Sequence, residues 1–368
     1  MGKVIYLPAN STSELDRPYP LESGDVLYMQ GSTLRANGRV QAIEPKGLRG
    51  VTIIGPGYLE WPDWPTENMY CLLNMYDCED FTIEKLHSRC SDTGTGNNTL
   101  SGQTVSCKRI TFRDCSWSGS RHSVGFQCDW SEDITFDNNR FFDNWLDGIK
   151  LTRENKRIFL NGGSAYNNGI YGSPRGAGIH ASAHGVSISN FSACGNNGDG
   201  IIIKSTKNIG TYGPRTGVSI RGCILNENRD YGVQSAVTNY YEETPFQIGV
   251  SVDGCSAEEN GIAGFCALGG TMNVSNSLAR LNKKFGVHYQ SQAEDCVLRD
   301  VWLVANKEAN LSDRGKDLRV ESVMSYAKDV VMAPKGEWDS VAGVCPLSIK
   351  TSGTSSIDKY RGVKSIGF

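Results

Sequence analysis

Four titratable residues stand beside short apolar runs, where acid–base chemistry would need them. Asp147 and Asp199 each precede a glycine that opens an apolar run, and Lys150 and His180 each lie two residues after such a glycine. Glycoside hydrolysis requires a pair of carboxylates. Proton abstraction instead requires one base with a pKa near neutrality, and two neighbouring basic groups lower each other's pKa. These four residues are therefore the candidate catalytic residues.

Aromatic and basic residues gather around these positions and could hold a sugar, because sugars stack on aromatic rings and are oriented by polar side chains. A calcium site would require several clustered carboxylates, and Asp129, Glu132 and Asp133 are the nearest group. They give only a weak signal, so we expect no metal and no cofactor. The candidate substrate-binding residues are Arg175, His184, Lys204, Tyr212, Tyr231, Tyr240 and Tyr241.

A repeated template positions these residues along the chain. Segments such as DITFDNNRFFDN and GVSIRGCILNEN recur, and the first apolar residue of each marks the start of one repeat, 22 to 32 residues after the previous start. Such a period with strand-forming residues indicates a β-solenoid, whose successive coils pair in parallel about 4.8 Å apart. The starts are Val51, Phe81, Ile110, Ile134, Ile158, Val186, Val218, Val250, Met272, Cys296 and Leu318.

An asparagine lies ten residues after the start in seven consecutive repeats. A bend in every coil needs a residue that tolerates the left-handed conformation and bonds to the backbone, as asparagine does. Stacked asparagine amides also bond to one another along the axis. A glycine four residues later opens a third strand in five of these repeats. We expect this bend and ladder at Asn144, Asn168, Asn196, Asn228, Asn260, Asn282 and Asn306.

Departures from the repeat predict a binding face. Insertions lengthen the turns on both sides of the third strand, at residues 169–177, 205–216 and 236–248, and insertions in solenoids gather on one face. Alternation along the third strand turns Lys150 and His180 outward on neighbouring coils, about 5 Å apart. Asp147 and Asp199 would lie about 10 Å apart, near the upper limit for an inverting hydrolase. We expect a trough over the third-strand sheet.

The asparagine ladder and the strand pattern resemble the right-handed parallel β-helix superfamily, the pectate-lyase-like fold, over roughly Val51–Lys328. The resemblance implies an all-β, single-stranded, right-handed parallel β-helix of about 11–12 coils. We expect N-terminal opening coils or a cap (1–50), the β-helix (51–336) and a C-terminal cap or tail (337–368). The fragments LDGIKL, DGIIIKS and AHGVSI are similar to polygalacturonase-type hydrolases. The adjacent Asp-Asp pair of that family is missing, so no catalytic role is transferred.

Composition limits the partners. The net charge is −3, which argues against nucleic acid or an anionic membrane as an obligate partner. The chain has no long apolar run and no Sec-type leader at Met1, so we expect no membrane insertion. Its twelve cysteines include no Cys-x-x-Cys pattern, and we interpret them as reduced core thiols. This holds even for Cys223 and Cys255, which neighbouring coils bring within disulfide range.

The opening VIYLPANSTSELDRPYPLESGDVLYMQGSTLRANG looks like the first coils of bacteriophage tailspike and depolymerase proteins. That resemblance implies a virion spike or fibre, a homotrimer that attaches to other virion proteins and binds a bacterial surface polysaccharide, with depolymerisation left open. Its synthesis in a host cytoplasm fits the unpaired cysteines. Two alternatives remain. The first is a free, secreted polysaccharide lyase or glycoside hydrolase of the same fold. The second is a non-catalytic structural virion component or adhesin.

Overall fold

The computed structural model describes residues 2–36, 40–61, 70–90, 99–152, 154–170, 176–182, 184–206, 217–238, 249–315, 318–321, 323–326, 349–351 and 363–364. Strands and turns make up this part of the chain, and no helix occurs in it. Within those ranges no helical segment is therefore long and apolar enough to cross a membrane. The chain divides into two units, Met1–Ser192 with Asn196–Gly198, and Ala193–Gly195 with Asp199–Phe368. The strand β17 (Ser192–Cys194) falls at the division.

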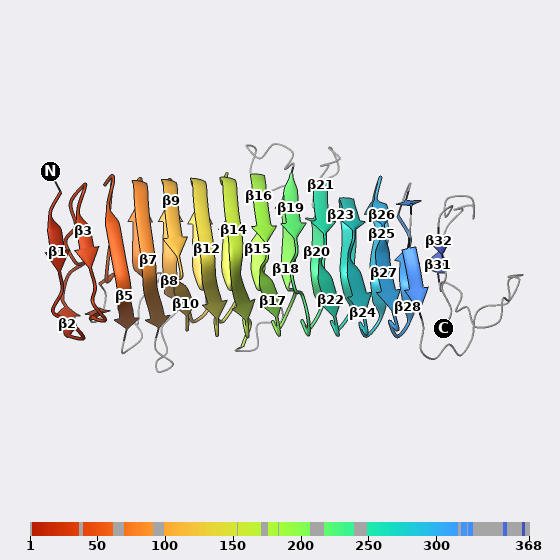
Figure 1. The fold of residues 1–368 in the computed structure, drawn as a ribbon, viewed down its shortest axis with the longest axis horizontal. Coiled ribbons are helices and arrows are strands. Elements are labelled where there is room, and N and C mark those ends of the chain that lie inside the picture. Colours follow the sequence, from red (N-terminus) through yellow and green to blue (C-terminus); the bar gives the residue numbers. More distant parts are fainter. Residues whose placement is uncertain are drawn as a thin grey trace, which may run out of the picture. The chain divides into compact units, whose positions relative to one another are not determined.

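The first unit is a stack of coils in which equivalent strands of successive coils pair in parallel (Figure 1). Its strands are β1 (Val4–Tyr6), β2 (Thr12–Leu15), β3 (Val26–Tyr28), β4 (Thr33–Ala36), β5 (Thr52–Trp61), β6 (Tyr70–Tyr76), β7 (Glu79–Cys90), β8 (Thr99–Val105), β9 (Lys108–Arg113), β10 (Ser116–Ser118), β11 (Phe126–Asp129), β12 (Glu132–Phe142), β13 (Ile149–Thr152), β14 (Lys156–Tyr166), β15 (Ile179–Ala181) and β16 (His184–Ser189). The first-strand sheet runs β1-β3-β5-β7-β9-β12-β14-β16. The third-strand sheet runs β6-β8-β11-β13-β15.

The second unit repeats this plan with three sheets of parallel strands. Its strands are β18 (Ile201–Thr206), β19 (Val218–Arg221), β20 (Tyr231–Thr238), β21 (Gly249–Asp253), β22 (Ser256–Glu258), β23 (Ala263–Ser275), β24 (Leu278–Arg280), β25 (Phe285–Ala293), β26 (Val297–Arg299), β27 (Val301–Val304), β28 (Ala309–Asp313), β29 (Arg319–Val320), β30 (Val323–Tyr326), β31 (Ile349–Thr351) and β32 (Val363–Lys364). The first-strand sheet runs β19-β21-β23-β26-β29, and the second β22-β24-β27-β30-β32. The third-strand sheet runs β18-β20-β23-β25-β28-β31.

The predicted register of the repeats is confirmed within each unit. In the first unit Ile134 pairs with Ile110 on one side and with Ile158 on the other. In the second unit Val250 pairs in the same way with Val218 and Met272. All six side chains are buried. The start of each repeat is therefore a column of apolar side chains in the core, since side chains on paired parallel strands lie above one another.

The predicted asparagine ladder is also present in each unit. In the first unit the Asn144 side chain donates to Asn168 Oδ1 at 2.9 Å, and Asn168 donates to Asn196 Oδ1 at 2.9 Å. In the second unit the donor–acceptor distances are 3.1 Å from Asn228 to Asn260, 3.0 Å from Asn260 to Asn282 and 2.8 Å from Asn282 to Asn306. Each of these donors also reaches a backbone carbonyl of the coil before it. The buried amides thus find their hydrogen-bond partners in the equivalent amides of the neighbouring coils and in the backbone.

The expectation that the ladder asparagine itself adopts the left-handed bend is wrong. Positive φ falls one residue earlier, for example 55° at Asp143, 52° at Asn167 and 57° at Glu227. The physical reason is that the ladder residue must turn its amide into the core, so the residue before it reverses the chain. The same place carries positive φ at Gly119, Asp143, Asn167, Gly195, Glu227, Glu259, Leu281 and Ala305.

Aromatic rings fill the core of the first unit. The Phe112 and Phe136 rings stack with centroids 5.1 Å apart, and the Trp117 and Phe126 rings meet edge to face at 4.6 Å. Gly102 makes room for them, because a Cβ atom there would lie 2.4 Å from the Phe126 ring.

The eleven cysteines of the described residues are free thiols, ten of them buried. They pack as small apolar side chains.

One corner of the first unit carries charges that alternate from coil to coil. Glu79, Lys108, Glu132 and Lys156 are register partners along the first-strand sheet, and the Lys108 ammonium lies 3.7 Å from the Glu132 carboxylate. The next residue in each coil repeats the pattern, so Arg157 Nε donates to Asp133 at 2.6 Å and Arg109 Nε to Asp80 at 2.6 Å. Opposite charges on neighbouring strands stabilise this pairing, and like charges would disfavour it.

The two predicted caps are described to different extents. Strands β1 and β3 of residues 1–50 pair in parallel with each other, and β3 pairs with β5, so this segment forms coils in register with those that follow. Of residues 337–368 only β31 and β32 belong to the described residues, and they pair in parallel with β28 and β30. The division into 1–50, 51–336 and 337–368 stays a prediction.

The ladder predicts a large cost for losing one amide. Asn168→Ala removes the acceptor of the Asn144 amide and the donor to the Phe141 carbonyl, which leaves buried polar groups without partners. We expect the free energy of unfolding to fall by about 2–4 kcal/mol, measured by urea denaturation. Asn161→Ala, an exposed asparagine of the same coil, is the matched control and should cost less than about 0.5 kcal/mol. Equal losses in the two variants would contradict a structural role of the ladder.

Candidate functional site

Polar side chains form a column on the outer face of the third-strand sheet in the first unit. Successive register partners along β6, β8, β11, β13 and β15 place these residues above one another, and the predicted juxtaposition of Lys150 and His180 is among them. Lys150 and His180 are half-buried. The column consists of Asn74, Gln103, Gln127, Lys150 and His180.

Asp147 joins this column through a hydrogen bond to His180. His180 Nδ1 lies 3.0 Å from Asp147 Oδ2, and the Ala177 N–H donates to Asp147 Oδ1 at 2.8 Å. The side chains are 14% and 9% exposed for His180 and Asp147. Burial alone would raise the pKa of the Asp147 carboxyl, but the neighbouring His180, the Ala177 N–H and Lys150 outweigh it and hold this pKa below its usual value of 3.8. Asp147 therefore stays ionised and acts as an acceptor.

This arrangement can remove a proton from a bound molecule. An ionised carboxylate that accepts from Nδ1 fixes the imidazole tautomer and leaves Nε2 as the basic nitrogen. Lys150 lies beside His180 on the paired strand and supplies a positive charge. A base next to a cation suits a substrate whose anion develops as the proton leaves.

Asp199 belongs to the second unit, where it accepts a backbone hydrogen bond of the same kind. The Tyr231 N–H donates to Asp199 Oδ1 at 3.2 Å, and the Asp199 side chain is buried. Because Asp147 and Asp199 belong to different units, their action as a carboxylate pair stays a prediction. Both aspartates serve the fold by accepting the N–H of the next coil.

On the third-strand sheet of the second unit, the exposure that alternation predicts for the outer side chains is wrong. The predicted walls of the trough lie largely outside the described residues, so the trough itself stays a prediction. Gln234, Cys266 and His288 are register partners, and each is at most 8% exposed. The Tyr231 hydroxyl bonds to the Cys266 thiol, and the Phe285 ring stacks on His288 with centroids 4.7 Å apart. Large aromatic side chains thus cover positions that alternation alone would expose.

Burial changes two titratable groups on this closed face. It raises the pKa of the Tyr231 hydroxyl, and the adjacent Cys266 and Asp199 act in the same direction. It lowers the pKa of His288 to about 4, together with nearby Arg314 and against the opposing Glu308. Both groups are neutral near pH 7, so this face offers hydrogen bonds and no charged base.

The remaining predicted binding residues are placed only in part. Lys204 lies on β18 next to Ala236 of β20 and is half-buried. His184 begins β16, and its side chain lies outside the described part of the structure. Four further predictions fall outside the described residues, namely Arg175, Tyr212, Tyr240 and Tyr241.

Sequence reasoning missed an aromatic pair next to Asp147. The Trp145 and His122 rings contact each other with centroids 4.0 Å apart. Trp145 directly follows the ladder residue Asn144. The sequence did contain a signal for this pair. The turn after each ladder asparagine leads into the third strand, so an aromatic residue in that turn lies near the candidate site.

Comparison with known proteins gives the fold. No protein-family model and no curated protein sequence matches the chain. The A-module of a mannuronan C-5 epimerase from Azotobacter vinelandii superposes with a TM-score of 0.54 at 12% identity, over 99% of this chain and 91% of that chain. The tailspike receptor-binding domain of Siphovirus 9NA gives 0.52 at 11%, over 96% and 72%. A polygalacturonase from Erwinia carotovora ssp. carotovora gives 0.50 at 13%, over 89% and 96%.

The chain is a right-handed parallel β-helix. This confirms the fold class that the repeat and the resemblance predicted. Identities of 11–13% carry the fold alone, so the chemistry has to be argued from the side chains of this β-helix.

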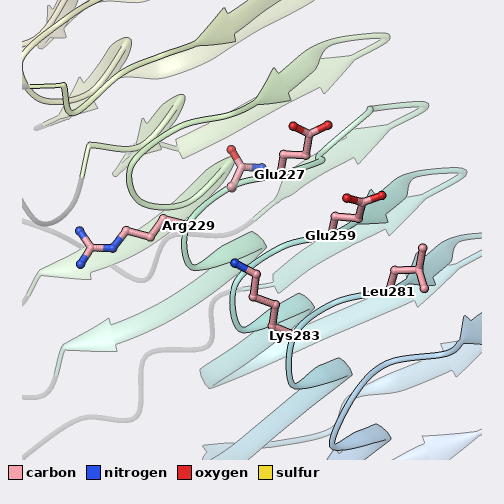
Figure 2. A pocket seen from close by; sticks show the side chains of 6 residues that line it. Glu227, Arg229, Glu259, Leu281 and Lys283 are labelled. Atoms are coloured by element: carbon pink, nitrogen blue, oxygen red, sulfur yellow. The ribbon is translucent and has the colours of Figure 1, made fainter.

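A surface hollow of about 510 Å³ lies on the second unit of the β-helix (Figure 2). Near this hollow two coils approach closely, because a Cβ atom on Gly261 would lie 1.8 Å from the Arg229 carbonyl oxygen. The Glu227 and Glu259 carboxylates project in the same direction and are exposed (Figure 2). The lining includes no histidine and no buried carboxylate, so the acid–base chemistry is better placed in the first unit.

The weak calcium candidate is occupied by other interactions. Glu132 and Asp133 both pair with Arg157. Asp129 is buried and accepts from Gln127 at 2.7 Å and from Thr152. Within the described ranges no group of three histidine, cysteine or carboxylate side chains is arranged to hold a metal ion.

The lowered pKa of Asp147 predicts a pH-dependent contribution to stability. The folded pKa lies below the unfolded value of 3.8, so the contribution is present above about pH 4 and is lost as the pH falls through the folded pKa. Asp147→Asn should lower the free energy of unfolding by about 1–3 kcal/mol at pH 7, with a smaller difference from wild type at pH 3. Urea denaturation at both pH values measures this, with the exposed Asp16→Asn as control. A pH-independent difference would show that the Asp147 charge is not responsible.

Proposed function

We propose that this β-helix binds an acidic polysaccharide across the third-strand sheet of its first unit and abstracts a proton from a uronate sugar. The observation that carries the proposal is the hydrogen bond between Asp147 and His180 beside Lys150. The similar folds of a mannuronan epimerase and a polygalacturonase support a polysaccharide as the substrate class. They do not choose the reaction.

His180 is the proposed base. Its Nδ1 is held by the Asp147 carboxylate, so Nε2 can take the proton at the carbon that bears the sugar carboxylate. The electron pair left on that carbon is delocalised into the carboxylate, and Lys150 neutralises the growing charge. Either the bond between C-4 and the 4-oxygen then breaks, which leaves a C4–C5 double bond, and the departing oxygen takes up the proton from His180 or one from water. Or a water molecule returns a proton to C-5 from the opposite face, and His180 gives its proton to the solvent. The first outcome is a lyase reaction and the second a C-5 epimerisation.

Hydrolysis is less well supported by this geometry. A glycosidase needs a carboxylic acid that is protonated at working pH, whereas His180, the Ala177 N–H and Lys150 lower the pKa of Asp147. Both Asp147 and Asp199 are buried and engaged by backbone N–H groups. We therefore favour proton abstraction over the predicted pair of hydrolytic aspartates.

Two readouts cover the two outcomes. Alginate and polygalacturonate are incubated with the full chain in D₂O, and deuterium at C-5, read by NMR, reports epimerisation. Ultraviolet absorbance reports the unsaturated ends of a lyase reaction, whose product keeps no hydrogen at C-5. We expect one of these signals in the wild type and a loss of about 10²-fold or more in His180→Ala and in Lys150→Ala.

Lys156→Ala is the matched control, because Lys156 is an exposed lysine of the same unit on the first-strand sheet. It should leave the exchange rate unchanged. Unaltered activity in His180→Ala, or neither exchange nor unsaturated product with either polymer in the wild type, would overturn the proposed chemistry.

A virion spike is the setting we propose for this activity. The likeness in fold to the tailspike receptor-binding domain of Siphovirus 9NA supports it. In that setting the polysaccharide would be a bacterial surface glycan, and the chain would assemble as a homotrimer attached to other virion proteins. A secreted, monomeric enzyme is the alternative, since the epimerase and the polygalacturonase have the same fold.

The oligomeric state separates these two settings. Most soluble assemblies are closed and symmetric. A trimer of this kind would have three times the chain mass of 40.2 kDa. We expect light scattering coupled to size-exclusion chromatography to give the trimer mass at micromolar concentration. A monomer mass at every concentration would favour the free enzyme.

A further inference from the structure

An aromatic pair lies on the turns that lead into β11 and β13. The Trp145 indole and the His122 imidazole lie with ring centroids 4.0 Å apart and an angle of 36° between their planes. They come from neighbouring coils, and both side chains are half-buried. The backbone N–H of Trp145 donates to the Ser120 carbonyl at 2.9 Å, which ties the two turns together.

The pair lies close to the proposed base. Trp145 precedes Asp147 by two residues, so their Cα atoms are at most about 7 Å apart. Leu146 between them packs against the buried cluster of Cys71, Leu100 and Val124. This contact anchors the turn that carries both Trp145 and Asp147.

The exposure of Trp145 differs from that of the core tryptophans in the same unit. Trp117 is 0% and Trp61 is 2% exposed, as expected for indoles whose only role is packing. Trp145, in contrast, is half-buried while its ring contacts His122. A large, flat, rigidly supported ring at the edge of a polar site suits the C–H face of a pyranose.

We propose that Trp145, supported by His122, is a stacking platform that binds a pyranose ring at a subsite next to the reacting sugar. This inference deepens the proposed function, on which it rests for the neighbouring sugar. The platform itself recognises the apolar face of the ring and is indifferent to the charge of the sugar. Because the indole is already held by His122 and the turn, little conformational entropy is lost when the sugar binds.

Binding without turnover tests the platform. Isothermal titration calorimetry is carried out on the full-length His180→Ala protein with short oligomers of mannuronate, of galacturonate and of α-1,3-linked glucose. Adding Trp145→Ala should weaken binding of whichever oligomer binds by about five- to tenfold, and Trp145→Phe by less than about threefold. Phe159→Ala is the matched control, because Phe159 is an exposed aromatic residue of the same unit and lies on the first-strand sheet. This variant should bind the oligomer with unchanged affinity.

Tryptophan emission separates contact from a structural effect. In the Trp145→Phe variant the heat of binding should persist while the change in emission disappears, whereas the Trp302→Phe control in the second unit should keep that change. Unchanged affinity in Trp145→Ala, or no measurable binding of any of the three oligomers, would overturn the platform. Binding that depends on Trp145, with neither proton exchange nor unsaturated product in the wild type, would overturn the proposed chemistry and leave the platform in place.

Discussion

The side-chain amides of five ladder asparagines donate both to a carbonyl of the coil before and to the amide oxygen of the coil after. These are Asn144, Asn168, Asn228, Asn260 and Asn282. Asn168, for example, bonds to the Phe141 carbonyl and to Asn196. A primary amide is donor and acceptor at once, so identical residues satisfy one another when they repeat at the strand spacing. A slip of one residue would remove the amide from its partners and reverse every side chain of the strand. The buried amides therefore fix the register on which all other columns of a unit depend.

Columns of charged side chains differ from the amide ladder. Identical amides can hydrogen-bond to one another, whereas identical charges on neighbouring coils repel. The corner of the first unit alternates Glu79, Lys108, Glu132 and Lys156 along the register. The ion pair between Lys108 and Glu132 is partly exposed and contributes little by itself. As a pattern, however, the column disfavours any pairing that skips a coil, since a skipped coil would place like charges together. The amide ladder therefore stabilises pairing with the adjacent coil, and the alternating charges disfavour pairing with the coil beyond it.

The repeat was readable from the sequence because its columns consist of residue types with one physical role. The starts, the ladder asparagines and the pairing of Lys150 with His180 all depend only on spacing, and the register bears them out. Burial depends on what side chains from other coils do. The exposure expected over Cys266 and His288 was wrong because Tyr231 and Phe285 fold across them. The hydrogen bond of Asp147 to His180 was equally hidden, because their separation of thirty-three residues includes an insertion of irregular length.

Asp147 shows how fold and chemistry share one group in this β-helix. One carboxylate oxygen accepts the Ala177 N–H of the next coil, and the other accepts from His180. In the second unit Asp199 accepts the Tyr231 N–H in the same way, so the backbone bond belongs to the repeat and is present whether or not a base is nearby. The repeat thus buries a carboxylate that must remain ionised to keep its acceptors. A histidine on the next coil can hydrogen-bond to this carboxylate, and no additional charge has to be buried for it. The acid–base pair is, on this argument, a small addition to a structural bond, and a β-helix offers such a place wherever an aspartate closes the turn before the third strand.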